Sequence, residues 1–175
     1  MTRAAAALAG LALACAHVPR EERPPFAFPR AFDANQAVTV RTDGDTRELL
    51  ASLRWRGGDL DVTLFDPVFA VPLLHASSRG GAVQVETLQA GPREDVARRL
   101  VGLLGELYAQ PFRATGPDRA EARSRHYAFR LDGVRAQGGC VFPDAIEVAP
   151  RMGPDVHVRV VTLELSCPAD AALGD

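Results

Sequence analysis

Two consecutive hairpins that share one buried face constrain the fold of this chain most. Residues 36–65, QAVTVRTDGDTRELLASLRWRGGDLDVTLF, alternate apolar and polar side chains around the turn pairs Asp43-Gly44 and Gly57-Gly58. Both pairs suit two-residue hairpin turns, because their residues tolerate positive φ angles. A slip of one residue would expose the whole apolar set, so the register is strongly specified. The predicted apolar pairs are Val38 with Leu49, Ala51 with Leu64, Leu53 with Val62, and Trp55 with Leu60.

Further strands are predicted later in the chain. Residues 80–88, GGAVQVETL, alternate in the same way, and residues 126–139, HYAFRLDGVRAQGG, contain a second Asp-Gly pair. A turn at this second pair, Asp132-Gly133, predicts another hairpin. The opposite residues in that hairpin would be Leu131 with Val134 and Phe129 with Ala136.

A last hairpin is predicted between CVFPDAIEV and VHVRVVTLELSC, which begin at residues 140 and 156. Uninterrupted alternation in its second strand predicts one face made of Val161, Leu163, Leu165 and Cys167. Pairing about the loop brings Cys140 opposite or diagonal to Cys167. In an oxidising compartment these two cysteines could form a disulfide, and two buried free cysteines would pack as well, so both arrangements stay open.

One segment, GPREDVARRLVGLLGELYAQPF at residues 91–112, has helical periodicity. Gly91-Pro92 suits a first helical turn, and Glu94 lies near the positive end of the helix dipole. We expect an amphipathic helix packed on the sheet, with Gly102 and Gly105 permitting either close approach or movement. Its apolar stripe consists of Val96, Leu100, Leu103, Leu104, Leu107 and Tyr108.

The order of these elements predicts a mainly β (α+β) fold. A curled antiparallel sheet of eight to eleven strands would form an open half-barrel, with the amphipathic helix as a lid. The chain's length of 175 residues and its 47% hydrophobic content suit one domain with a real core. We place this domain at residues 30–168 and a solvated tail at residues 169–175.

The N-terminal sequence MTRAAAALAGLALACAHVPR resembles an export signal. The apolar run from Ala4 to Ala14 is too short to span a bilayer comfortably, and Cys15 follows it as in a lipoprotein lipobox. We therefore predict a signal peptide at residues 1–14 and a lipidated Cys15 on a proline-rich tether, residues 15–29. Ala16 after the cysteine favours the outer membrane, with the domain facing the periplasm. A conventional secretory signal cleaved nearby is the alternative.

Motifs of catalysis or of cofactor binding do not occur in the sequence. It contains no nucleophile elbow, zinc-protease helix, dinucleotide-binding loop or P-loop, and its four histidines are scattered. We therefore predict no catalytic residue, no metal and no cofactor. An enzyme with an unfamiliar site stays open as an alternative to the binding functions given below. The net charge of −2 without a basic stripe argues against nucleic acid, and a monomer is expected.

Residues 51–88, ASLRWRGGDLDVTLFDPVFAVPLLHASSRGGAVQVETL, resemble the central hairpins of the LolA/LolB lipoprotein-localisation superfamily, and residues 140–166 resemble its closing hairpin. Related proteobacterial outer-membrane lipoproteins of similar length share this layout. The resemblance implies an incomplete barrel whose helical lid encloses a cavity for the acyl chains of lipoproteins or lipids. It also implies a LolA-like periplasmic carrier as a partner. In LolB-like proteins, a hydrophobic residue on a protruding loop assists membrane insertion; here that loop would be Pro67, Val68 and Phe69.

The apolar face supplies the candidate cavity residues. A filled core would show the same periodicity, and Val68 and Phe69 could equally cap that core, with Pro72 folding the run back over it. The corresponding alternative function is an accessory envelope lipoprotein that keeps the fold without transfer activity. The candidate cavity residues are Leu49, Leu53, Trp55, Val62, Leu64, Leu100, Leu104, Phe129 and Leu163.

Overall fold

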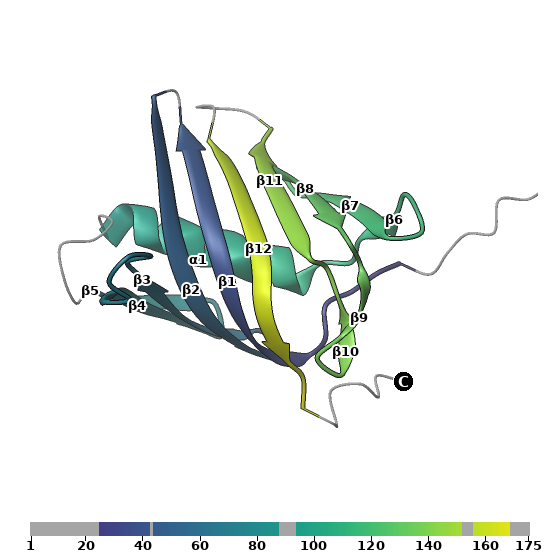
Figure 1. The fold of residues 1–175 in the computed structure, drawn as a ribbon, viewed down its shortest axis with the longest axis horizontal. Coiled ribbons are helices and arrows are strands. Elements are labelled where there is room, and N and C mark those ends of the chain that lie inside the picture. Colours follow the sequence, from purple (N-terminus) through teal and green to yellow (C-terminus); the bar gives the residue numbers. More distant parts are fainter. Residues whose placement is uncertain (1–24, 43, 88–93, 152–155, 169–175) are drawn as a thin grey trace, which may run out of the picture.

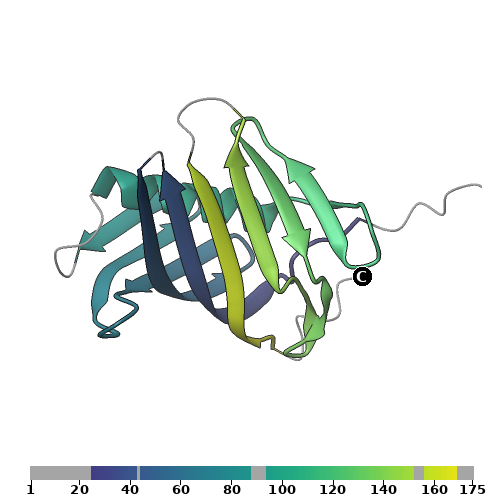
Figure 2. The same cartoon turned by 45° about the horizontal axis from the view of Figure 1, so that its top comes forward.

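A ten-stranded antiparallel sheet curls around one helix (Figure 1). The computed structural model describes residues 25–42, 44–87, 94–151 and 156–168. The helix α1, Glu94–Ala109, lies along the concave side of the sheet, as both views show (Figure 1, Figure 2). The strands are β1 (Ala31–Thr42), β2 (Asp45–Arg56), β3 (Asp59–Phe65), β4 (Pro72–Arg79), β5 (Ala82–Thr87), β6 (Arg113–Ala114), β7 (Arg119–Arg123), β8 (Tyr127–Asp132), β9 (Arg135–Gln137), β10 (Cys140–Phe142), β11 (Ala145–Pro150) and β12 (His157–Ser166).

The strand order β5-β4-β3-β2-β1-β12-β11-β8-β7-β6 brings the last long strand beside the first. Strands β9 and β10 form a separate two-stranded hairpin. The large sheet does not close into a barrel, so the predicted open half-barrel with a helix is confirmed. Registers of the first two hairpins are also confirmed, including Val38 opposite Leu49 and Leu53 opposite Val62.

The hairpin predicted at Asp132-Gly133 is wrong. β8 pairs with β7 and β11, while the chain after Gly133 turns away to form β9, which pairs with β10. Gly133 has a φ of 68°, and a Cβ there would lie 2.5 Å from a carboxylate oxygen of Asp144. The Asp-Gly pair therefore turns the chain, but toward the side hairpin and not back along β8.

Leu163 lies on the outer face of β12, because Val158 and Val160 of the same strand face the core and alternation carries Leu163 to the other side. Gln36 lies opposite Thr162 and Asn35 opposite Glu164, so Leu163 has no partner on β1. This bulge shifts the alternation that follows it, so Leu165 lies opposite the buried Ala34 and packs against the core. Leu163 is 56% exposed, and its predicted place among the inward-facing side chains is wrong.

Helix α1 buries a stripe slightly rotated from the predicted one. Leu103, Leu104, Leu107 and Tyr108 are buried as expected, together with Ala97 and Val101, whereas Val96 is 48% exposed. A Cβ built at either Gly102 or Gly105 would meet nothing within 4 Å. Close approach to the sheet therefore does not require these glycines.

Aromatic side chains close one end of the half-barrel. The Phe28 ring lies 4.9 Å from the Tyr108 ring and 5.1 Å from the Phe142 ring, and Phe26 forms a bridge with Phe112. Phe28 is buried in the core although the sequence placed it in the tether. The folded domain therefore begins near residue 26, and only the earlier part of the predicted tether lies outside the described residues.

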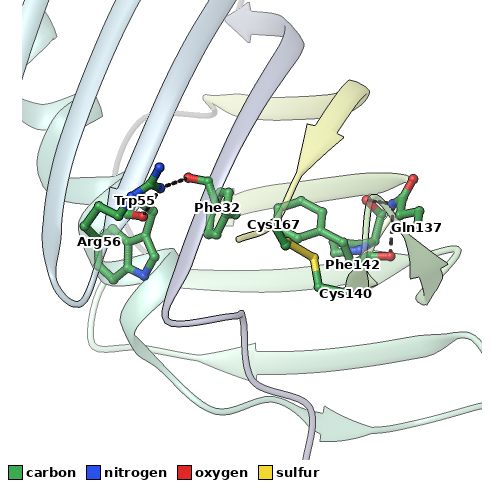
Figure 3. Close-up of a disulfide and its surroundings, with 8 residues drawn as sticks. Phe32, Trp55, Arg56, Gln137, Cys140, Phe142 and Cys167 are labelled. Atoms are coloured by element: carbon green, nitrogen blue, oxygen red, sulfur yellow. Dashed lines mark hydrogen bonds between the residues drawn. A yellow bond between two sulfur atoms is a disulfide. The ribbon is translucent and has the colours of Figure 1, made fainter. Parts of the chain in front are cut away.

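The β9–β10 hairpin is attached to the end of β12 by a disulfide between Cys140 and Cys167, whose Cα atoms lie 6.0 Å apart (Figure 3). The amide of Cys167 also donates a hydrogen bond to the carbonyl of Gly138 at 2.9 Å. The hairpin holds Phe142 against Phe32, with ring centroids 4.9 Å apart. The sequence left open whether these two cysteines form a disulfide or stay free, and the structure has the disulfide.

Candidate functional site

The concave face of the sheet brings together most of the predicted cavity residues. Leu53, Val62, Leu64 and Phe129 are at most 2% exposed, and Trp55 and Leu104 are also buried. Leu49 and Leu100 are partly buried and pack against the same apolar cluster. With Leu163 excluded, these residues form a continuous apolar surface from β2 and β3 to β8, roofed by α1.

Helix α1 is attached to the sheet chiefly by apolar contacts with β3, β4 and β5. Hydrogen bonds near the two ends of the helix reinforce them. The Arg98 guanidinium donates to the carbonyl of Val83 at 2.8 Å and also pairs with Glu94 at 2.7 Å. At the other end, the Tyr108 hydroxyl donates to Oε1 of Gln36 at 3.1 Å. Because apolar contacts are non-directional, another apolar group could replace them.

The interior below α1 is filled in this conformation. Leu53, Val62 and Leu64 each expose no more than 2% of their surface, whether to outside solvent or to internal space. Almost no water-sized space therefore adjoins these side chains. A ligand can reach them only if the elements packed against them, such as α1 on β3, move away.

Gln36 and Tyr108 form a polar pair inside this apolar site. Burial raises the pKa of the Tyr108 phenol above its ordinary value. The hydroxyl is therefore a protonated donor throughout the physiological pH range. Gln36 is 1% exposed, and its Nε2 atom has no hydrogen-bond partner. Sequence reasoning missed this residue, although its place two positions before Val38 puts it on the same face.

A protruding loop between β3 and β4 presents two apolar side chains to solvent. Val68 is 78% exposed and Phe69 is 77% exposed, so neither of them caps the core. The Asp66 carboxylate fixes the loop by accepting hydrogen bonds from the amides of both residues at 2.9 Å. Pro67, also exposed, completes this loop, which we call the apolar tip (Pro67, Val68 and Phe69).

Ala70 and Pro72 shape the backbone beside the tip. Among the described non-glycine residues, Ala70 is the one with a positive φ, at 53°. A non-glycine residue in this region is strained by about 1 kcal/mol. Pro72 opens β4 opposite Phe65 and is exposed. The alternative in which Pro72 folds the segment back over the core is therefore wrong.

Polar hollows lie on the outer face of the sheet. One of about 870 Å³ is lined by charged side chains that pair with one another, such as Arg54 with Asp33 at 3.1 Å and Arg79 with Asp61 at 2.7 Å. Burial alone would raise the pKa of Asp33, but hydrogen bonds from Arg56 and Arg54 outweigh burial and hold that pKa below its ordinary value. These pairs stabilise the sheet and leave the hollow unsuited to an apolar ligand.

Metal binding, membrane spanning and the predicted export signal were also considered. In the part of the chain that the structure describes, no three His, Cys, Asp or Glu side chains are grouped so that they could hold a metal ion. No described helix is long and apolar enough to cross a bilayer. Cys15 and the predicted signal peptide lie outside the described residues, as does the tail from residue 169.

Comparison with known proteins identifies the fold. Neither protein-family models nor curated protein sequences match this chain. The structure is similar to that of LolA superfamily protein NE2245 from Nitrosomonas europaea, with a TM-score of 0.56 and 12% sequence identity. The matched region covers 85% of this chain and 93% of that protein. The chain therefore has the LolA/LolB-like superfamily fold that the sequence resemblance predicted.

Proposed function

We propose that this protein is a non-enzymatic envelope lipoprotein that binds the acyl chains of lipoproteins or lipids between α1 and the concave face of its sheet. In this proposal the protein passes these chains on for insertion into the outer membrane. One observation carries the proposal: a continuous apolar face, including Leu53, Val62 and Leu64, is roofed by a single amphipathic helix. The LolA-like fold supports it, because a solved protein of that superfamily has the same architecture.

Acyl binding requires exchange of one apolar surface for another. When α1 lifts, the side chains beneath it lose their cover, and an inserted hydrocarbon chain restores that cover. Each methylene buried contributes about 0.8 kcal/mol, so a long chain can offset the cost of opening. The filled interior sets this cost and would keep the empty site closed to water.

In this proposal, the predicted lipid anchor and the apolar tip hold the protein at the membrane. Lipidation of Cys15 would hold the protein at the outer membrane, with the folded domain in the periplasm and a LolA-like carrier as the donor of clients. Val68 and Phe69 would enter the lipid surface from a loop whose backbone Asp66 already fixes. We expect the protein to act as a monomer.

The filled interior also favours a second candidate, an accessory envelope lipoprotein without transfer activity. A variant that weakens the attachment of α1 to the sheet can distinguish the two candidate functions. Arg98→Gln removes the ion pair with Glu94 and weakens the hydrogen bond to Val83. Because Arg98 is half-exposed, we expect a loss of about 1 kcal/mol in the closed state and a roughly fivefold gain in affinity for a fluorescent fatty acid.

The matched control is Arg125→Gln, which changes an exposed arginine far from α1 in sequence. Unchanged binding by this control together with tighter binding by Arg98→Gln supports a mobile roof. If wild type and both variants bind no fatty acid, the accessory function is the better account.

A further inference from the structure

The site beneath α1 contains one polar group whose hydrogen-bonding capacity is not met. Among the residues that the structure describes, Gln36 is the one buried residue with a non-aromatic polar side chain. Its Oε1 atom accepts the Tyr108 hydroxyl, and its Nε2 atom has no partner. Unpaired amide groups in a dry interior destabilise a fold, so such a group calls for an explanation.

Reversing the amide does not remove the deficit. The Gln36 side chain brings two N–H donors, and the Tyr108 oxygen can accept only one of them. At least one N–H therefore stays unpaired in either orientation. The deficit belongs to the pair itself and does not depend on which end of the amide faces Tyr108.

Small side chains surround Gln36 on the sheet. Its cross-strand neighbour on β2 is Ala51, and Ala34 precedes it by two residues on the same face; both are buried. The space above them is taken by Tyr108, whose ring centroid lies 5.1 Å from that of Phe32 and 5.9 Å from that of Trp55. Withdrawal of α1 would remove Tyr108 and leave an apolar recess with one free amide group, that of Gln36.

We propose that Gln36 is a specificity-determining residue of this site, which selects acyl chains that carry a carbonyl oxygen over plain hydrocarbons. When Tyr108 withdraws with α1, Nε2 of Gln36 donates a hydrogen bond to the carbonyl of an ester- or amide-linked acyl group. The hydrocarbon then lies along the apolar face that includes Leu53 and Val62. This inference rests on the proposed acyl-binding function and names the chemical class of its ligand.

Two variants isolate the amide. Tyr108→Phe removes the hydroxyl and keeps Gln36. The double variant Gln36→Leu/Tyr108→Phe replaces both polar groups by apolar ones of similar shape, a change that is often neutral or stabilising. We would use the full-length chain carrying Cys15→Ser, which removes the acylation site. Thermal melting of both variants verifies folding before any binding measurement.

The assay compares methyl dodecanoate with pentadecane, which has the same number of heavy atoms, as competitors of the neutral fluorescent probe N-phenyl-1-naphthylamine. Wild type and Tyr108→Phe should prefer the ester by roughly threefold to tenfold relative to the double variant, the range expected for one hydrogen bond. Infrared spectra of a carbonyl-labelled ester add a direct readout. Its stretching band should shift to lower frequency in wild type and in Tyr108→Phe, but not in the double variant.

Two results would overturn the inference in different ways. Equal ester preference in all three proteins, with an unshifted carbonyl band, shows that acyl chains bind without Gln36, and leaves the proposed function standing. Failure of both competitors to displace the probe from any of the proteins removes the proposed function and this inference together.

Discussion

The apolar tip offers a perturbation that separates membrane insertion from core packing. Replacing Val68 and Phe69 by glutamate alters two side chains that are 78% and 77% exposed in the folded protein. Because folding buries little of either side chain, the free energy of unfolding should change by no more than about 0.5 kcal/mol.

The effect on membrane binding should be far larger. Full burial of a valine or phenylalanine side chain contributes about 1.5–3 kcal/mol. Since about three quarters of each side chain is available for insertion, the pair should contribute roughly 2–4.5 kcal/mol. Loss of that contribution corresponds to binding weaker by roughly 30-fold to more than 1000-fold.

The assay is flotation of the chain carrying Cys15→Ser with phosphatidylcholine vesicles, alongside thermal melting. A matched control, Val141→Glu/Leu163→Glu, makes the same change in charge at two other exposed apolar residues. The tip variant should lose vesicle binding while the control keeps it. The reasoning is refuted if the tip variant melts at a sharply lower temperature, or if both double variants bind vesicles equally well.

Three further predictions concern stability. Cys140→Ser/Cys167→Ser should lower the free energy of unfolding by about 3.5 kcal/mol, the chain-entropy value for a sequence separation of 27, and a urea titration showing a loss below about 1 kcal/mol would contradict this. Tyr108→Phe should cost about 1–3 kcal/mol, because it leaves Oε1 of Gln36 buried and unpaired; an unchanged urea midpoint would argue against the pair. The lowered pKa of Asp33 means that its contribution is present above its ordinary pKa of 3.8 and is lost as pH falls through the folded-state value, so Asp33→Asn should be less stable than wild type at neutral pH and should approach it in acid. A stability difference that stays constant from pH 7 to pH 2 would show that the Arg54 and Arg56 pairs do not cause it.

Local pattern was sufficient to predict the sheet where turns and periodicity agree. The hairpins around Asp43-Gly44 and Gly57-Gly58 have the predicted registers because each strand buries one alternating face. Leu163 and Leu165 were predicted to share one face, because the bulge that separates them in β12 has no marker in the local sequence. Alternation from the buried Val158 and Val160 puts Leu163 on the outer face. The turn at Asp132-Gly133 was recognised, but the partner of the following strand depends on packing of distant residues.

The candidate site could be predicted only in part. The prolines at 67 and 72 show that this segment cannot continue a central strand, but they leave open whether Val68 and Phe69 are exposed or cap the core. The role of Phe28 could not be read from a proline-rich segment, since its partners Tyr108 and Phe142 are far away in sequence. Gln36 was within reach of the two-residue period, whereas its unpaired Nε2 depends on where α1 places Tyr108.

The central claim is that acyl chains bind between α1 and the sheet, and native mass spectrometry tests it most directly. The protein would be residues 24–175, exported to a bacterial periplasm and purified without detergent. The account predicts additional mass from co-purified acyl lipid, or the uptake of one fatty acid when it is supplied in excess. A mass that stays that of the protein alone, under conditions where the fold is intact, would contradict the claim.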